Sequence, residues 1–269
     1  MKQSNDKGHK ILVIGDSCVD KFVYCRCVRL SPEAPVPVLD IVRTTENFGM
    51  AGNVRANIES INGKCEKIFN QNYRDIIKTR YVEDKTNHMF IRIDKSQKVK
   101  RIPKHYIEEL TGELRGYYDA IVISDYNKGF LLEKDIELIS SLGSPTFMDT
   151  KKRLGRWASH VNYIKINRKE YAESLKEINT HNLSNNIIET LGDGGCRYQG
   201  ETFPVKGAEV KDLAGAGDSF LAALVINYLE SKDIKQAISF ANHCATQVVK
   251  RKGVTCIQKR DARSFKSKA

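Results

Sequence analysis

The chain has 269 residues, of which 41% are hydrophobic and 29% charged, and its formal net charge is +11. This length suits one large domain with a substantial core, and no apolar run approaches the length of a membrane span. The polar Met1–Lys10 segment has no following apolar stretch, so we expect neither a leader nor a membrane partner.

The positive charge fits an anionic substrate better than a nucleic acid, because basic and aromatic residues do not interleave as in single-strand platforms. The basic residues at 259–269 are expected to form a solvated tail. The seven cysteines are scattered and lack zinc-site spacing, which favours reduced thiols and a cytoplasmic protein.

Short apolar runs without alternation recur along the chain, as in strands covered on both faces. The runs are Ile11–Ile14, Ala120–Ile123, Thr146–Met148, Tyr163–Ile166 and Ile187–Ile188. Helical patterns lie between or after them at Val54–Ile61, Tyr106–Leu114, Glu133–Leu142, Lys169–Lys176, Ser219–Leu229 and Ile234–Val249. This alternation predicts an α/β fold with a mostly parallel sheet flanked by helices.

Polar side chains follow four of these predicted strands, namely Asp16, Asp125, Asp149 and Asn167. Ligands of such sheets bind beyond the carboxyl ends of the strands, so this edge is the expected site. Each residue alone could instead close an Asx turn.

Two segments break the alternation, at about 20–45 and 79–95. The first contains three closely spaced prolines between 32 and 37, which a central strand does not accept. The second alternates polar and apolar residues on either side of the polar turn Asp84–Asn87. Together they predict a small antiparallel sheet inserted into the α/β domain as a lid. Its outer apolar face, with Val36, Val38 and Ile41, would need a cover.

A glycine turn, Gly215-Ala216-Gly217, precedes Asp218 and an apolar helical run. Small residues let the backbone approach a ligand, and the free N–H groups of a helix start attract anions. Asp218 could accept a proton from a substrate hydroxyl there, so phosphoryl transfer is the leading interpretation. The alternative is that Asp218 is only a helix N-cap.

This turn, the Asn167–Glu170 segment and the early Gly15-Asp16 strand end resemble the ribokinase-like (PfkB) carbohydrate kinases. Further strings resemble the heptose-phosphate kinases of that family, and the likeness runs from about Ile11 to Ile257. These strings are Leu30–Val38, Phe90–Asp94, Ser124–Gly129 and Phe240–Asn242. The resemblance implies a ribokinase-like three-layer sandwich with a β-lid, forming one kinase domain over 1–269.

The resemblance also implies site residues. Asp218 would be the catalytic base, and Gly215, Ala216 and Gly217 the anion hole. Asn167, Glu170, Thr190, Gly195 and Asn242 would border the nucleotide, with Glu170 holding Mg²⁺ through water. Asp16, Gly49, Asn53, Arg92, Asp125 and Lys128 would contact the sugar, with Arg92 and Lys128 also facing its phosphate.

The implied reaction is phosphorylation by ATP and Mg²⁺ of the anomeric hydroxyl of D-glycero-D-manno-heptose 7-phosphate. A monovalent cation is a further option, and a homodimer through the lid is expected. Met50 and Leu213 depart from the family pattern. A kinase for another sugar or sugar phosphate therefore stays open as an alternative, as does a non-catalytic ligand-binding descendant.

Overall fold

The computed structural model describes residues 8–62, 64–95 and 98–266. Within these ranges the core is an eight-stranded sheet of order β12-β11-β10-β9-β8-β7-β1-β4. Its strands are β1 (Ile11–Gly15), β4 (Glu66–Phe69), β7 (Ala120–Asp125), β8 (Thr146–Thr150), β9 (Tyr163–Asn167), β10 (Ile187–Thr190), β11 (Cys196–Tyr198) and β12 (Glu201–Phe203). The strands from β10 to β4 pair in parallel, and β11 and β12 are antiparallel. The predicted mostly parallel sheet is confirmed.

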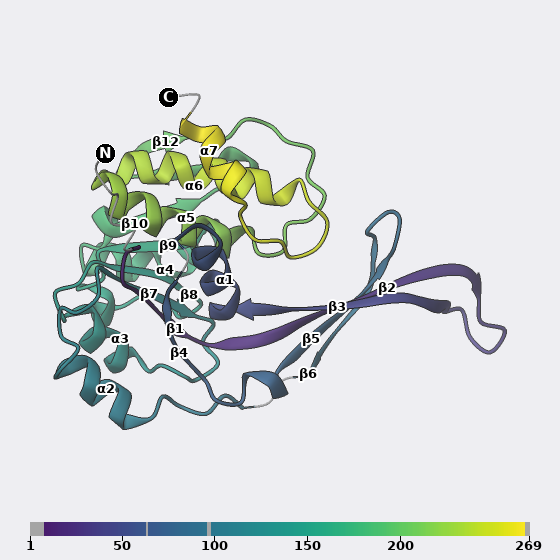
Figure 1. Cartoon of the computed structure of the whole chain (residues 1–269), viewed down its shortest axis with the longest axis horizontal. Coiled ribbons are helices and arrows are strands. Elements are labelled where there is room, and N and C mark those ends of the chain that lie inside the picture. The colour runs from purple at the N-terminus through teal and green to yellow at the C-terminus, as the bar shows by residue number, and fades with distance from the viewer. Residues whose placement is uncertain (1–7, 63, 96–97, 267–269) are drawn as a thin grey trace, which may run out of the picture.

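Helices cover both faces of this sheet (Figure 1). They are α1 (Ala51–Asn62), α2 (Lys104–Thr111), α3 (Glu133–Ser140), α4 (Arg168–Thr180), α5 (Ala216–Ser231), α6 (Ile234–Val249) and α7 (Lys259–Lys266). Ile11 and Val13 of β1 belong to the core on the α1, α5 and α6 side, while Leu12 and Ile14 belong to the core beneath α2 and α3. This arrangement of three layers explains why the core strands are apolar on both faces.

A second sheet of four strands, which we call the lid, has the order β3-β2-β5-β6. Its strands are β2 (Ser17–Leu30), β3 (Pro37–Met50), β5 (Ile77–Glu83) and β6 (Met89–Lys95). The prediction of an antiparallel lid is wrong for one pairing, because β2 and β5 are parallel. The reason is that β2 follows β1 and β5 follows β4, and these two neighbours in the core sheet are themselves parallel.

The lid extends away from the core, with the β2–β3 hairpin reaching furthest (Figure 1). Pairing of β2 with β5 ends at Cys25, so the outer part of the hairpin is a ribbon of two strands only. The proline-rich segment forms the hairpin tip, as Pro32 and Pro35 lie between the strands and Pro37 begins β3. At its base the lid packs Phe22, Tyr24 and Val82 against Ala214 and Val254 of the core domain.

The C-terminal segment differs from the expected solvated tail, since Lys259–Lys266 form α7. Asp261 is buried and forms an ion pair with Arg251 at 2.5 Å. Phe265 contacts Phe240 of α6 with ring centroids 5.3 Å apart. Asp261 and Phe265 thus hold this helix against the domain. The basic composition of the segment had instead suggested a solvated tail. No helix in the described ranges combines the length and hydropathy that crossing a membrane requires.

Candidate active site

The turn formed by Gly215, Ala216 and Gly217 brings the start of α5 to the carboxyl edge of the core sheet. Gly215 has a φ of +81°, a left-handed conformation that favours glycine. A Cβ atom on Gly215 would lie 2.8 Å from Nδ2 of Asn53, and one on Gly217 would lie 2.7 Å from Nζ of Lys165. The turn therefore admits only small residues, and the Lys165 ammonium lies beside the helix start. Both features create positive potential for an anion.

Asp218, in the first turn of α5, is buried and held by two hydrogen bonds. Asn53 Nδ2 donates to its Oδ2 at 2.8 Å, and the Tyr126 hydroxyl donates to its Oδ1 at 3.0 Å. Burial raises the pKa of Asp218 to about 6, and the charge of Asp149 adds to this, while the bond from Asn53 opposes it. A carboxylate with this pKa is ionised near neutral pH and is basic enough to accept a proton.

One cavity, of about 380 Å³, opens between the lid and the core beside Asp218; we call it the lid cavity. Its lining is strongly charged and comes from both lid and core. The residues are Asp20, Met50, Asn53, Lys78, Arg80, Arg92, Asp94, Tyr126, Lys128, Lys151, Ala214, Gly215, Asp218 and Val254. Three residues predicted for the sugar side, Asn53, Arg92 and Lys128, line this cavity.

The structure does not place the other predicted sugar residues on the cavity wall. Asp16 is fully buried, and its carboxylate accepts N–H bonds from Tyr126 at 2.8 Å and from Lys128 at 3.3 Å. Asp125 accepts from Thr150 Oγ1 and Lys152 Nζ, both at 2.6 Å. Asp16 thus holds the loop after β7, and Asp125 is bonded to the end of β8 and the residues that follow it. Both end buried strands, where packing leaves only protein partners.

Asp20, which the sequence analysis did not name, is a carboxylate on the cavity wall. It lies in β2, lines the lid cavity and forms an ion pair with Arg80 at 2.6 Å. Gly49 of β3 lies against it, and a side chain on Gly49 would collide with the Asp20 carboxylate. Gly49 is thus a space-making residue next to the cavity. The signal that could have found Asp20 is the alternation of β2, which puts Asp20 and Phe22 on one face.

A second cavity, of about 540 Å³, lies on the other side of the glycine turn; we call it the nucleotide cavity. Ala216 and Gly217 line it, as do the predicted Thr190, Gly195 and Asn242. Further lining comes from apolar and small residues, including Leu213, Val205, Gly207, Val210, Phe220, Ala245 and Val249. An apolar slot of this kind suits a flat base. The glycine turn therefore separates two cavities, with Asp218 facing the lid side.

Asn167 and Glu170 lie outside the lining of both cavities and cap α4. The Asn167 side chain accepts from the Glu170 N–H at 2.9 Å, and Glu170 Oε2 accepts from the Asn167 N–H at 2.9 Å. The other oxygen, Oε1, accepts from Lys151 Nζ at 2.6 Å. The described residues contain no cluster of three potential metal ligands. Glu170 is an oxygen donor of the kind that magnesium takes, and its carboxylate is bonded to Asn167 and Lys151 in this structure.

A chain of charged side chains, of which Asp149 and Lys165 are buried, joins Glu170 to the glycine turn. Lys151 bonds both Glu170 and, at 3.1 Å, Asp149, which in turn forms an ion pair with Lys165 at 2.5 Å. Burial alone would raise the pKa of Asp149, but the two ammonium groups outweigh it and lower that pKa. Lys165 is 5% exposed and was missed from sequence, since it precedes Asn167 within an apolar strand.

The two departures from the family pattern both border cavities. Met50 lines the lid cavity with a φ of +58°, a conformation that a residue with a side chain adopts only under strain. Leu213 is 70% exposed and lines the nucleotide cavity. Met50 is buried and also packs in the core beneath α2 and α3, whereas Leu213 lies at the surface.

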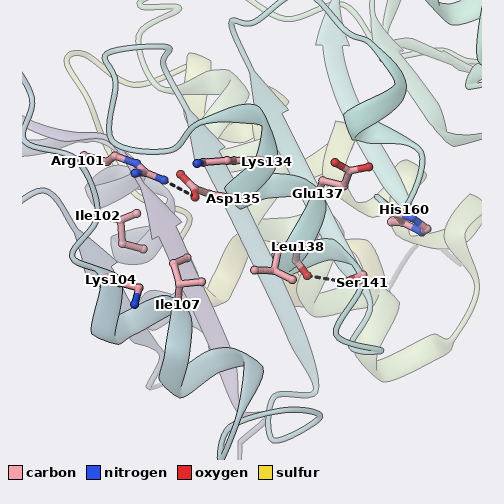
Figure 2. A pocket seen from close by; sticks show the side chains of 10 residues that line it. All are labelled: Arg101, Ile102, Lys104, Ile107, Lys134, Asp135, Glu137, Leu138, Ser141 and His160. Carbon is pink, nitrogen blue, oxygen red and sulfur yellow. Dashed lines mark hydrogen bonds and ion pairs between the residues drawn. The ribbon is translucent and has the colours of Figure 1, made fainter.

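A larger hollow of about 630 Å³ lies between α2 and α3, on the face of the sheet opposite α5 (Figure 2). Arg101 and Asp135, both in its lining, form an ion pair at 2.7 Å, and Ile102, Ile107 and Leu138 add apolar side chains to the lining. None of the predicted site residues lines it. It is therefore separate from the two cavities at the glycine turn.

Comparisons with known proteins identify similar sequences and structures. The model of the pfkB family carbohydrate kinases matches residues 81–260. The bifunctional protein HldE of Helicobacter pylori strain J99 is 31% identical over 91% of this chain, and that of Campylobacter jejuni strain RM1221 is 31% identical over 96%. The chain spans 63% and 65% of these two relatives, respectively.

Solved structures share the fold at low identity. Phosphofructokinase-2 from Escherichia coli, in complex with potassium, superposes with a TM-score of 0.73 at 13% identity, covering 97% of this chain and 99% of that one. The ribokinase of Thermotoga maritima gives a TM-score of 0.70 at 17% identity, covering 96% and 99%. The ribokinase-like architecture is thereby confirmed.

Proposed function

This chain belongs to the pfkB family of carbohydrate kinases, and within that family we propose that it phosphorylates the anomeric hydroxyl of D-glycero-D-manno-heptose 7-phosphate. As a family member it is a phosphotransferase that moves a phosphoryl group from ATP to a sugar hydroxyl. The observation that carries the proposal is the position of Asp218 between the glycine turn and a cationic cavity large enough for a sugar phosphate.

In the proposed reaction Asp218 takes the proton of the acceptor hydroxyl as the oxygen attacks the γ-phosphorus. Asn53 and Tyr126 orient the two carboxylate oxygens through their hydrogen bonds. Because both bonds also favour the charged form, they keep the pKa from rising further than about 6. The base is thus fixed in position and ionised at neutral pH.

The transferring phosphoryl group would lie at the glycine turn, between the two cavities. Free N–H groups at the start of α5 would donate to its oxygens, and the ammonium of Lys165 adds a positive charge beside Gly217. Since Lys165 is already held by Asp149, little reorganisation is needed when negative charge develops. These groups favour the transition state over the ground state.

ATP would occupy the nucleotide cavity beside Thr190, Gly195 and Asn242. Magnesium, when bound, would neutralise phosphate charge, with Glu170 contacting it through water. The Asn242 amide donates to the Phe203 carbonyl at 2.9 Å, so its part is to shape the adenine slot. A monovalent cation is a further cofactor that this proposal allows but does not require.

The heptose assignment is supported by the Leu30–Val38 and Ser124–Gly129 strings and by the positive lid cavity. A kinase for a different sugar phosphate is the second candidate, because Met50, which departs from the family pattern, lines the cavity with a positive φ. A panel of sugar phosphates with ATP and Mg²⁺, scored by ADP release and kcat/KM, separates the two. If heptose 7-phosphate is a poor substrate beside another panel member, the first candidate is wrong.

We also propose that the protein forms a homodimer through the lid. In β6, Arg92 faces the lid cavity, so its neighbours Ile91 and Ile93 face away from it and are about half exposed. Ile41 in β3 is 65% exposed and Val36 at the hairpin tip 51%. A ribbon of two strands is marginally stable alone in water. A second copy offering the same face would cover these side chains by a twofold contact.

A further inference from the structure

The lid cavity contains more positive charge than its own carboxylates neutralise. Five cationic side chains line it, Lys78, Arg80, Arg92, Lys128 and Lys151, against three carboxylates, Asp20, Asp94 and Asp218. Lys151 is neutralised by Asp149 and Glu170, which lie outside the lining, so the excess within the cavity is one positive charge. Solvent ions or a bound anion must balance this excess, since like charges in a partly closed space repel one another.

Three of the five cations are already paired with carboxylates. Arg80 bonds Asp20 at 2.6 Å, and Lys151 bonds Asp149 and Glu170. The guanidinium of Arg92 makes two hydrogen bonds of 2.7 Å to Asp94. This bidentate contact occupies the fork that the sequence analysis assigned to a substrate phosphate. Arg92 therefore helps to shape the lid rather than offering a free pair of donors.

Lys78 and Lys128 are the two lining cations without a carboxylate at ion-pair distance among the described residues. Lys78 lies in β5, two residues before Arg80, and so points to the same face of the lid. Its Nζ is 5.2 Å from the ring centroid of Tyr126. Lys128 lies two residues beyond Tyr126, on the loop that Asp16 ties down through backbone N–H groups. The lid and the core thus each contribute one unpaired ammonium.

We propose that Lys78 and Lys128 form the subsite for the phosphate that the sugar already carries. A phosphate monoester is close to dianionic at pH 7, and its charge matches that of the two unpaired ammonium groups together. Two flexible ammonium groups can donate to its three oxygens from opposite sides. Because Lys78 belongs to the lid and Lys128 to the core, the bound phosphate ties one to the other. This inference rests on the proposed sugar-phosphate kinase activity and names the residues that select the phosphorylated form.

The test compares Lys78→Met and Lys128→Met with a charge-matched control, Lys67→Met, at an exposed position in β4 away from the cavities. Methionine keeps the length of the side chain and removes its charge. For each protein, kcat/KM is measured with the preferred sugar phosphate of the panel and with its dephosphorylated form, together with the KM for ATP. Inorganic phosphate serves as a second probe, as an inhibitor competing with the sugar phosphate.

Each cavity variant should lose roughly ten- to a hundred-fold in kcat/KM for the phosphorylated sugar, as expected for a lost charge-assisted hydrogen bond. The dephosphorylated sugar and ATP should be little affected, and the inhibition constant of inorganic phosphate should rise in the same variants. Lys67→Met should behave as wild type. Equal losses on both sugar forms, or wild-type discrimination in both lysine variants, would overturn the subsite.

Failure of the subsite and failure of the heptose proposal give different results. If the wild-type protein prefers another sugar phosphate, the heptose assignment is wrong, and the two lysine variants still test the subsite. If wild type prefers unphosphorylated sugars, both fall. If heptose 7-phosphate is the substrate but the lysine variants keep wild-type discrimination, only the subsite falls.

Discussion

Asn53 Nδ2 donates a 2.8 Å hydrogen bond to Asp218 Oδ2, joining two residues that lie 165 positions apart in the chain. Asn53 is in the first turn of α1, which follows the lid strand β3, and Asp218 is in the first turn of α5. The bond therefore connects the starts of two core helices at the base of the proposed reaction. Asp218 does not act as a helix cap, because its carboxylate is bonded to Asn53 and Tyr126 and not to the N–H groups of α5.

Replacing Asp218 with Asn should abolish most activity and spare nucleotide binding. The amide keeps the shape of the carboxylate but accepts no proton, and removal of a general base lowers kcat by roughly 10²- to 10⁴-fold. The dissociation constant for ATP, measured by calorimetry, should change little. Asp233→Asn is the matched control, since Asp233 caps α6 through two N–H bonds and should keep full activity. Near-normal turnover by Asp218→Asn would make that residue structural.

The same variant should be more stable than wild type at neutral pH. Because folding raises the pKa of Asp218 from 3.8 to about 6, the carboxyl group favours the folded state at low pH, and this contribution is lost as pH rises through 6. Asn carries no charge to bury, and Tyr126 can accept from its amide. The Tm difference should be positive at pH 7.5 and shrink towards pH 4. A difference independent of pH would contradict the raised pKa.

Activity should fall on the acid side with an apparent pKa near 6, since only the ionised Asp218 accepts a proton. In Tyr126→Phe this limb should move to higher pH, because the hydroxyl bond that lowers the pKa is lost. Profiles of kcat/KM against pH, from 5 to 9, measure both positions. Tyr117→Phe removes a hydroxyl far from the cavity and should leave the limb in place. An unmoved limb in Tyr126→Phe would assign it to another group.

The main sheet and most of its helices could be predicted because their apolar periodicity reflects burial on both faces. The α6 range Ile234–Val249 was predicted to the residue, since Asp233 caps it. The β11–β12 hairpin and β4 are too short to leave a pattern. The parallel β2–β5 pairing depends on where distant strands leave the core sheet, which no local pattern records.

The glycine turn could be predicted because its sequence motif determines the backbone conformation. The hydrogen-bond and ion-pair partners of individual side chains could not, because they depend on the tertiary structure. Gly215 and Gly217 are needed for space, so the glycine turn was found from its composition. Asp16 and Asp20 look alike in sequence, but Asp16 follows a fully buried strand and Asp20 faces the cavity. Lys165 is an ammonium in an apolar strand, and only its contact with Asp149 explains it.

Breaking the buried pair of Lys165 and Asp149 should reduce both stability and activity. Lys165→Met leaves the Asp149 carboxylate buried with only Lys151 as a partner, and loss of one member of a buried pair is destabilising by about 3–5 kcal/mol. Adding Asp149→Asn removes the unpaired charge and should restore most of the unfolding free energy measured in urea. Activity should stay low in the double variant, because the positive charge beside Gly217 is still missing. Recovery of both would make the pair purely structural.

The dimer proposal makes a prediction about mass in solution. At micromolar concentration light scattering should give about twice the 30.5 kDa of one chain. Ile91→Asp and Ile93→Asp should shift it towards the monomer, since a charge on the outer face of β6 would have to lose its water on association. Leu175→Asp, at a similarly exposed apolar position in α4, is the control and should stay dimeric. A wild-type protein that scatters as a monomer at all concentrations would refute the twofold lid contact and leave the outer apolar face to another partner.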